Sequence, residues 1–210
     1  MSGCDDPTPH RLTDTPGYDA EATISPRGDR IVFTSLRGGD LDLYTMNLDG
    51  SDVRQITHEI GYDGGAYFSP DGSKIVWRAS RPKPGPELEE YKTLLAQGLI
   101  KPHALDIYMA NADGTDVRRL TDNGAANFAP FFHPSGKKVI FCSNVDDPQR
   151  RRFDLHLVNV DGTGVERVTF GDGFDGFPMW SPDGKTLVFC SGRFSSGPHQ
   201  TNVFVADWVE

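Results

Sequence analysis

The sequence predicts an all-β fold, a β-propeller of four blades with four strands in each. The first observation behind this is a 16-residue stretch that occurs three times, as DLYTMNLDGSDVRQIT (42–57), DIYMANADGTDVRRLT (106–121) and DLHLVNVDGTGVERVT (154–169). The second is a partial fourth copy, NVFVADW (202–208). The third is a short turn motif that accompanies every copy. Repeats of 40 to 50 residues that each hold several short strands are typical of propeller blades.

The turn motif sets a common frame for the four units. It reads SPRG, SPDG, HPSG and SPDG, and a threonine lies twelve residues before each copy, with an aspartate or asparagine midway between. The motifs begin at Ser25, Ser69, His133 and Ser181, the threonines are Thr13, Thr57, Thr121 and Thr169, and the midway residues are Asp19, Asp63, Asn127 and Asp175. Both positions match in all four units, so the units share one structure.

Each unit contains four strand-like segments. In the first unit they are AEATIS, RIVFTS, DLYTMNL and VRQIT, which are rich in β-branched and aromatic residues. Pro, Asp and Gly separate them and favour tight turns between antiparallel strands. The predicted repeats are about 18–57, 62–121, 126–169 and 174–208, within one propeller domain at 10–210 that follows a disordered tail at 1–9.

The fourth unit ends after its third strand, and HRLT (10–13) matches the missing fourth strand. We predict that this N-terminal strand completes the last blade and closes the ring, which gives a monomer and hides the sheet edges. The alternative is an open arc of a larger propeller, whose ends would meet in a homodimer.

The second unit is longer because RPKPGPELEEYKTLLAQGLIKPH separates its second and third strands. Pro86 and nearby glutamates mark a helix start, and Gly98 and Pro102 mark its end. We predict a short amphipathic helix over about 86–97, which either lines the channel, meets a partner or packs on its own blade.

The loops after the second and fourth strands share one end of the propeller and are long, so function is expected there. The residues predicted to surround the channel mouth at this end are Asp19, Asp63, Asn127, Asp175 and Glu21, with the aromatic residues Tyr18, Tyr62 and Phe174. The carboxylates suit a basic peptide or calcium. Alternatively, each aspartate caps its own turn and the aromatic residues pack between blades.

Three arginines follow the second strands at equivalent positions, Arg37, Arg81 and Arg193. We expect them to pair with the residue that opens the third strand, which is Asp42, Asp106 or Asn202 in the same units.

Composition narrows the function. The net charge of −9 argues against nucleic acid as a partner, and no apolar run is long enough to span a bilayer. No nucleophile elbow, zinc-binding helix or phosphate-binding loop is present. His58, His103 and His199 are the residues from which a metal site on the loop face would have to be built.

The pattern SPDG…IVF…SR…DLYTMNLDGSDVRQIT resembles the propeller repeat of the TolB-like family over residues 10–208. The resemblance implies a periplasmic protein that binds partner proteins at the channel. TolB proteins have six blades and a further N-terminal domain, whereas this chain shows four units and no export signal. Cys4 resembles the end of a lipoprotein signal, but the apolar stretch that must precede it is absent. We expect an exposed cysteine in the disordered tail, and the alternative is a truncated lipoprotein start. Similar propellers are fused to prolyl-oligopeptidase-type peptidases, and a related fold carries pectate lyases.

These observations predict a non-catalytic binding propeller that docks a peptide or protein on its loop face, with calcium as a possible cofactor. The alternatives are a metal-dependent polysaccharide lyase and the gating propeller of a peptidase.

Overall fold

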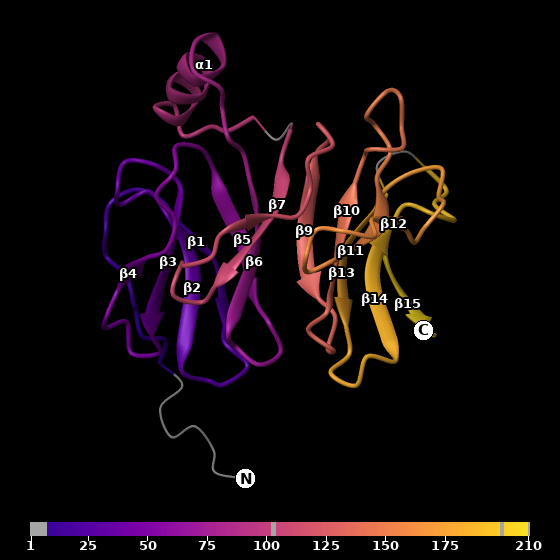
Figure 1. The fold of residues 1–210 in the computed structure, drawn as a ribbon, viewed down its shortest axis with the longest axis horizontal. Coiled ribbons are helices and arrows are strands. Elements are labelled where there is room, and N and C mark those ends of the chain that lie inside the picture. The colour runs from indigo at the N-terminus through magenta and orange to yellow at the C-terminus, as the bar shows by residue number, and fades with distance from the viewer. Residues whose placement is uncertain (1–7, 102–103, 198–199, 210) are drawn as a thin grey trace.

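The computed structural model describes residues 8–101, 104–197 and 200–209. It is an all-β arc of four antiparallel sheets that follow one another along the chain (Figure 1), as the sequence predicts. Residues 1–7 of the predicted tail, Cys4 among them, lie outside the described residues. The described part of the chain has no helix with the length and apolar character needed to cross a membrane.

The strands are assigned to blades in chain order. Blade 1 consists of β1 (Asp19–Ile24), β2 (Arg30–Ser35), β3 (Asp42–Asn47) and β4 (Arg54–Gln55). Blade 2 consists of β5 (Asp63–Phe68), β6 (Lys74–Ala79), β7 (Asp106–Asn111) and β8 (Arg118–Arg119). Blade 3 consists of β9 (Asn127–Phe132), β10 (Lys138–Ser143), β11 (Asp154–Asn159) and β12 (Glu166–Arg167). Blade 4 consists of β13 (Asp175–Trp180), β14 (Thr186–Ser191) and β15 (Asn202–Asp207).

The first strand of each blade is its inner strand, and each inner strand has a register shift where it pairs with the second strand. By contrast, the second and third strands pair without interruption in all four blades. A bulge of this kind bends a strand and turns one side chain away from the ladder. Each inner strand therefore has a bulge at the equivalent position.

The hydrophobic core lies between successive blades. Val32 and Leu43 of blade 1 pack with Phe68 and Trp77 of blade 2, and the same pattern joins blade 2 to blade 3 and blade 3 to blade 4. Because each blade buries its apolar face only against its neighbours, the array gains stability from every boundary.

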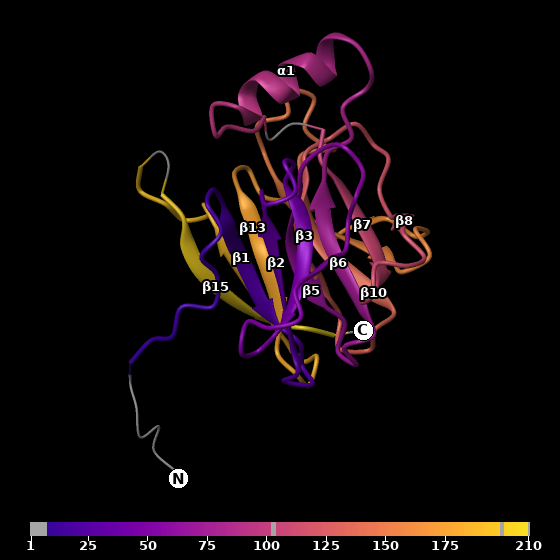
Figure 2. The same ribbon diagram turned by 90° about the vertical axis from the view of Figure 1, so that its left-hand side faces the viewer.

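The helix in the second unit is α1 (Pro86–Leu95), close to the predicted range. It begins with Pro86 after Gly85 and has Glu87 and Glu89 in its first turn, where acidic side chains favour the helix dipole. Figure 2 shows α1 at the end of the propeller that is opposite the turns joining β1 to β2. This end is the predicted loop face.

The prediction that residues 10–13 complete the last blade is wrong. The sheet of blade 4 has three strands, and residues 10–13 lie in no strand. Among the described elements, β1 contacts β5, β5 contacts β9 and β9 contacts β13, but β1 does not contact β13. We attribute the open ring to the bulky side chains between blades, such as Phe68 and Trp77, because a ring of only four blades requires a sharper turn at each boundary.

Candidate functional site

The aspartates predicted at the channel mouth form ion pairs with arginines of their own blades. Each inner-strand aspartate pairs with the arginine that follows the second strand: Asp19 with Arg37 (3.2 Å), Asp63 with Arg81 (2.8 Å) and Asp175 with Arg193 (2.6 Å). The prediction that these arginines bind the residue opening the third strand is therefore wrong. Both carboxylates lie near the same end of the blade, on the two strands that flank the arginine's own strand. The third-strand carboxylate is already bonded by the outer part of its blade, as Asp42 is by Gln55 and Thr57, and the arginine pairs with the inner one.

The aspartates that open the third strands hold the short fourth strands instead. The Thr57 hydroxyl donates a hydrogen bond to Asp42 (3.0 Å) and accepts one from the Leu43 backbone N–H (2.9 Å). The same arrangement recurs at Thr121 with Asp106 and at Thr169 with Asp154. We call each aspartate–threonine pair a blade latch. The latches explain why a threonine recurs at this position in the repeat.

Asp63 is the most enclosed of the inner carboxylates, with none of its surface exposed. The Trp77 indole N–H donates to its Oδ1 (2.5 Å), and Oδ2 has no hydrogen-bond partner among the described residues. Burial raises the pKa of Asp63 to about 7, against the opposing effect of the Arg81 charge. Asn127, the equivalent residue in blade 3, uses its amide to bond Leu105 O and Asn123 Oδ1, both at 2.8 Å.

The predicted calcium ligands thus lie in separate blades, each with its own partners. No group of three or more His, Cys, Asp or Glu side chains is placed to hold a metal ion within the ranges that the structure describes. Two of the three histidines considered for a lyase-type metal site, His103 and His199, lie outside those ranges.

A cleft of about 470 Å³ opens at the channel mouth between blade 1, blade 2 and α1. We call it the mouth cleft. Its walls are mainly apolar, and three polar side chains, Glu21, Tyr62 and Arg78, converge in it. The remaining lining residues are Gly17, Tyr18, Leu36, Leu41, Leu95, Gly98 and Ile100. Apolar walls with a few convergent polar groups are the usual composition of a ligand-binding site.

The polar cluster is centred on Glu21, which reaches from β1 across the blade boundary. Glu21 forms an ion pair with Arg78 of β6 and accepts hydrogen bonds from the Tyr62 hydroxyl and the Gly65 backbone N–H, both at 2.9 Å. Arg78 also donates to the Tyr62 hydroxyl (2.6 Å), and its guanidinium lies 5.4 Å from the centre of the Tyr62 ring. Burial opposes the Arg78 charge, but Tyr62 and Glu21 together raise the pKa of Arg78 above its ordinary value.

Two adjacent glycines make room for this cluster. A Cβ at Gly64 would lie 2.2 Å from the Tyr62 hydroxyl and 2.4 Å from Glu21 Oε2, and a Cβ at Gly65 would lie 2.3 Å from Arg78 Nη1. Gly65 also has a φ of +63°, a conformation that glycine adopts without strain. The two glycines of the DGG sequence in β5 therefore leave the space that this largely enclosed charged cluster occupies on the channel side.

Helix α1 forms one wall of the mouth cleft and is fixed to both blades. Its only buried residue, Tyr91, donates a hydrogen bond to Asp40 of blade 1 and packs with Leu41, Tyr62 and Leu105. Leu88 and Leu95 lie against the same cluster. The helix therefore packs on the propeller and also lines the channel mouth, so two of its three predicted roles hold together.

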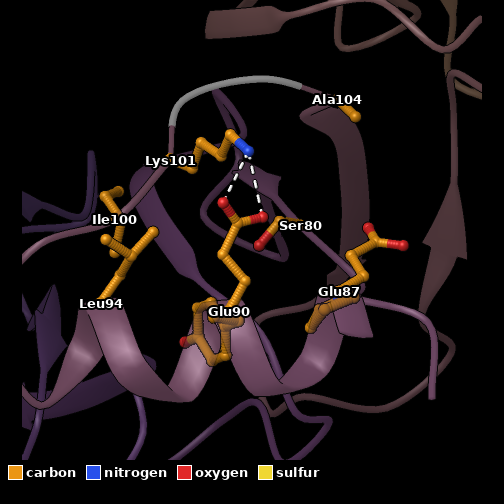
Figure 3. Close-up of a pocket in the computed structure, with 9 residues that line it drawn as sticks. Ser80, Glu87, Glu90, Leu94, Ile100, Lys101 and Ala104 are labelled. Atoms are coloured by element: carbon orange, nitrogen blue, oxygen red, sulfur yellow. Dashed lines mark hydrogen bonds and ion pairs between the residues drawn. The ribbon is translucent and has the colours of Figure 1, made fainter. Parts of the chain in front are cut away.

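A second, much smaller pocket lies on the other side of α1 (Figure 3). Lys101 reaches over it and bonds both carboxylate oxygens of Glu90, at 2.8 and 3.0 Å. Its volume of about 30 Å³ is the space taken by one water molecule. This pocket lies between α1 and the segment that follows it, and it is too small for a ligand.

A larger hollow of about 650 Å³ lies between the outer parts of blades 2 and 3. Its charged groups are already paired, since Arg119 bonds Asp106 (2.6 Å) and Arg167 bonds Asp154 (2.7 Å). His156 is buried there, with Nε2 2.8 Å from Asp146 Oδ2. These groups pair within their own blades, whereas the Glu21–Arg78 pair of the mouth cleft crosses a blade boundary.

The bulges of the four inner strands place Glu21, Gly65, Ala129 and Phe177 at one level, all with φ between +51° and +63°. Only Glu21 of these was predicted at the channel mouth from the sequence. Their common signal is their position two residues after the midway Asp or Asn. Phe177 is 56% exposed although its ring lies near Phe128 and Phe174. Non-glycine residues in this conformation are strained, and such strain concentrates at functional sites.

Of the residues predicted at the channel mouth, the structure brings Tyr18, Glu21 and Tyr62 together in the mouth cleft. Phe174 joins an aromatic cluster with Phe128 and Phe153 at the boundary of blades 3 and 4. Arg78 could not be identified from the repeat, because no other unit carries an arginine at that position of its second strand.

Comparisons with known proteins agree with this architecture. The family model of the TolB β-propeller domain matches residues 91–197, about half of the chain. The structure is similar to TolB from Acinetobacter baumannii, with a TM-score of 0.74, 20% identity and coverage of 97% of this chain and 44% of that one. It is also similar to a putative TolB from Agrobacterium tumefaciens, with a TM-score of 0.67, 24% identity and coverage of 91% and 63%.

A puromycin-hydrolyzing peptidase from Mycobacterium tuberculosis has a TM-score of 0.64 at 16% identity, over 89% of this chain and 29% of that one. At such identities the structural likeness shows the fold alone. The chain spans less than two thirds of the length of either TolB structure. On the match of the family model and the four-blade arrangement, the chain belongs to the TolB β-propeller family.

Proposed function

We propose that this protein is a non-catalytic binding module that docks a peptide or protein partner at the mouth cleft, in an extracytoplasmic compartment as in TolB-like proteins. The observation that carries the proposal is the Glu21–Arg78–Tyr62 cluster at the channel mouth, for which two adjacent glycines of β5 leave the space. A structural ion pair alone does not require an adjoining cleft with apolar walls.

The cleft chemistry fits an extended peptide. Its apolar walls at Tyr18, Leu36 and Leu95 would take an aliphatic or aromatic side chain. Arg78 lines the cleft, and its Nε–H and remaining N–H groups would bond a main-chain carbonyl or a carboxylate of the partner. Glu21 keeps the guanidinium in place because it accepts from Arg78 while its other oxygen is held by Tyr62 and Gly65.

The experiment is selection of binders from a random seven-residue peptide display library on the immobilised chain, followed by calorimetric titration of the selected peptides. We expect Tyr18→Ala and Leu95→Ala to weaken binding by roughly tenfold each, the usual effect of truncating an anchor residue. Phe170→Ala removes an exposed aromatic ring far from the cleft and is the control. It should leave the affinity unchanged.

Two results would contradict the proposal. One is the recovery of peptides whose binding is insensitive to the cleft variants. The other is cleavage of oligogalacturonides in the presence of a divalent metal, which would favour the lyase alternative instead.

A further inference from the structure

The two ends of the arc expose the two halves of an interface that the chain buries at each of its three blade boundaries. On the third strands, Leu43, Ile107 and Leu155 are fully buried by the next blade. The residue at this position in blade 4, Val203, is 74% exposed. Val205, two residues on, is 71% exposed and lies on the same face of β15. We call this surface of blade 4 the trailing face.

The opposite end shows the reciprocal exposure. Phe68, Phe132 and Trp180 occupy the last positions of the inner strands of blades 2, 3 and 4 and are at most 8% exposed, because the preceding blade covers them. The equivalent residue of blade 1, Ile24, is 63% exposed. We call this surface of blade 1 the leading face.

The leading face also carries residues 10–13 in the place of a fourth strand, and we call this segment the spare strand. The Ile56 carbonyl of blade 1 lies against Gly114 of blade 2, where an added Cβ would be 2.7 Å from it. The Leu12 carbonyl lies against Gly50 of blade 1 in the same way, at 2.9 Å. Leu12 therefore already occupies the position of a fourth strand from a preceding blade, while β15 pairs with no fourth strand among the residues that the structure describes.

We propose that the trailing face of one copy of this chain binds the leading face of a second copy, head to tail. The two faces are complementary because they are the two sides of the same blade boundary, continued beyond the ends of the chain. In this contact β15 of one copy pairs with residues 10–13 of the other. The contact covers an apolar surface and a free sheet edge together, and both favour association when exposed.

The blade latch gives the contact a defined register. In blades 1 to 3 the hydroxyl of the latch threonine accepts the N–H of the residue that follows the latch aspartate. Thr13 is the equivalent threonine of the spare strand. It would accept the Val203 N–H of the other copy and lie beside Asn202, the residue at the latch position of β15.

The test is the mass of the chain in solution, measured by light scattering after size exclusion over a hundredfold range of concentration. We expect a species of at least twice the 23.1 kDa of one chain. Val203→Asp should reduce it to a monomer, because it puts a charge in the centre of the trailing face. Val117→Asp is the matched control, an exposed valine on the outer part of blade 2 that lies on neither face.

A mixing experiment distinguishes head-to-tail association from other contacts. Ile24→Asp blocks the leading face and should also give a monomer. An equal mixture of the Val203→Asp and Ile24→Asp chains keeps one intact face of each kind, so it should form a two-chain species that neither forms alone.

Three results would overturn the proposal: a monomer of the unaltered chain at every concentration, an assembly unaffected by Val203→Asp, or a mixture that stays monomeric. The first would mean that the two faces do not bind each other. The cleft variants proposed above do not enter this test, so a failure here leaves the proposed function standing.

Discussion

Glu21 on β1 and Arg78 on β6 form an ion pair that crosses from blade 1 to blade 2. Their side chains are only 24% and 21% exposed, so water screens the pair weakly. The pair connects residues 57 positions apart in the sequence and joins the blade boundary to the mouth cleft.

Glu21→Gln tests the weight of this pair. The amide leaves the guanidinium of Arg78 without its counter-charge in a largely enclosed site, so we expect the free energy of unfolding to fall by about 1–3 kcal/mol. Urea denaturation measures it. Glu89→Gln, which removes an exposed partner of Lys92 on α1, should change the midpoint little. Equal effects of the two variants would show that the cluster contributes no more than a surface pair.

Gly65→Ala tests the space reserved for the cluster. The added methyl group would force Arg78 away, so the variant should lose about 1–3 kcal/mol from broken charged hydrogen bonds, in addition to about 1–2 kcal/mol of backbone strain. Gly124→Ala separates the two contributions, because Gly124 has nearly the same φ, +62°, and no atom within 4 Å of its added Cβ. If both variants are equally stable, the glycine is required only for its backbone.

The pH dependence of stability reports on Asp63. Its pKa is about 7 in the folded chain, against an ordinary value of 3.8. Between these values the folded chain binds a proton that the unfolded chain releases, so the contribution of Asp63 to stability decreases as the pH rises from about 4 to about 7. Asp63→Asn cannot release a proton and should lack this decrease.

The measurement compares thermal unfolding of the two proteins at pH 4.5 and 7.5. The unaltered chain should lose stability relative to Asp63→Asn at the higher pH. A difference that is the same at both values would mean that the ion pair with Arg81 keeps Asp63 charged throughout.

Tyr91→Phe tests the attachment of α1. Loss of the hydrogen bond to Asp40 removes a contact with a charged group worth about 1.5–3 kcal/mol, and the amides of α1 should exchange with solvent hydrogen roughly tenfold faster or more. Lys92→Gln alters an exposed neighbour on the same helix and serves as control. Unchanged exchange in Tyr91→Phe would mean that the apolar contacts of Leu88 and Leu95 hold the helix alone.

The repeat made the blades and their strand order predictable, because both depend on turn chemistry and strand patterns present in several copies. Helix α1 occurs in one unit and was predictable from its own start and stop signals. The partner of Arg81 was not predictable, since Asp63 and Asp106 both lie on strands that pair with β6. Asp106 is already bonded by Arg119 and Thr121, and Arg81 pairs with Asp63.

Ring closure and the polar cluster depend on contacts between blades. The spare strand at 10–13 was recognisable, but its partner depends on how sharply successive blades turn, and that is set by side-chain packing. The Glu21–Arg78 pair occurs at one boundary only, so no periodic signal announced it. The adjacent glycines Gly64 and Gly65, found in no other unit, were the one local trace.

The blade latches have a consequence for how the molecule comes apart. Strand β4 belongs to the sheet of blade 1 by its hydrogen bonds, yet the carbonyl of Ile56, the residue that follows it, lies against Gly114 in the DG turn of blade 2. Unfolding of one blade therefore removes a packing contact from the next blade along the chain. Unfolding should therefore pass from one blade to the next along the chain. Proteolytic cleavage next to one latch threonine would destabilise the following blades as well.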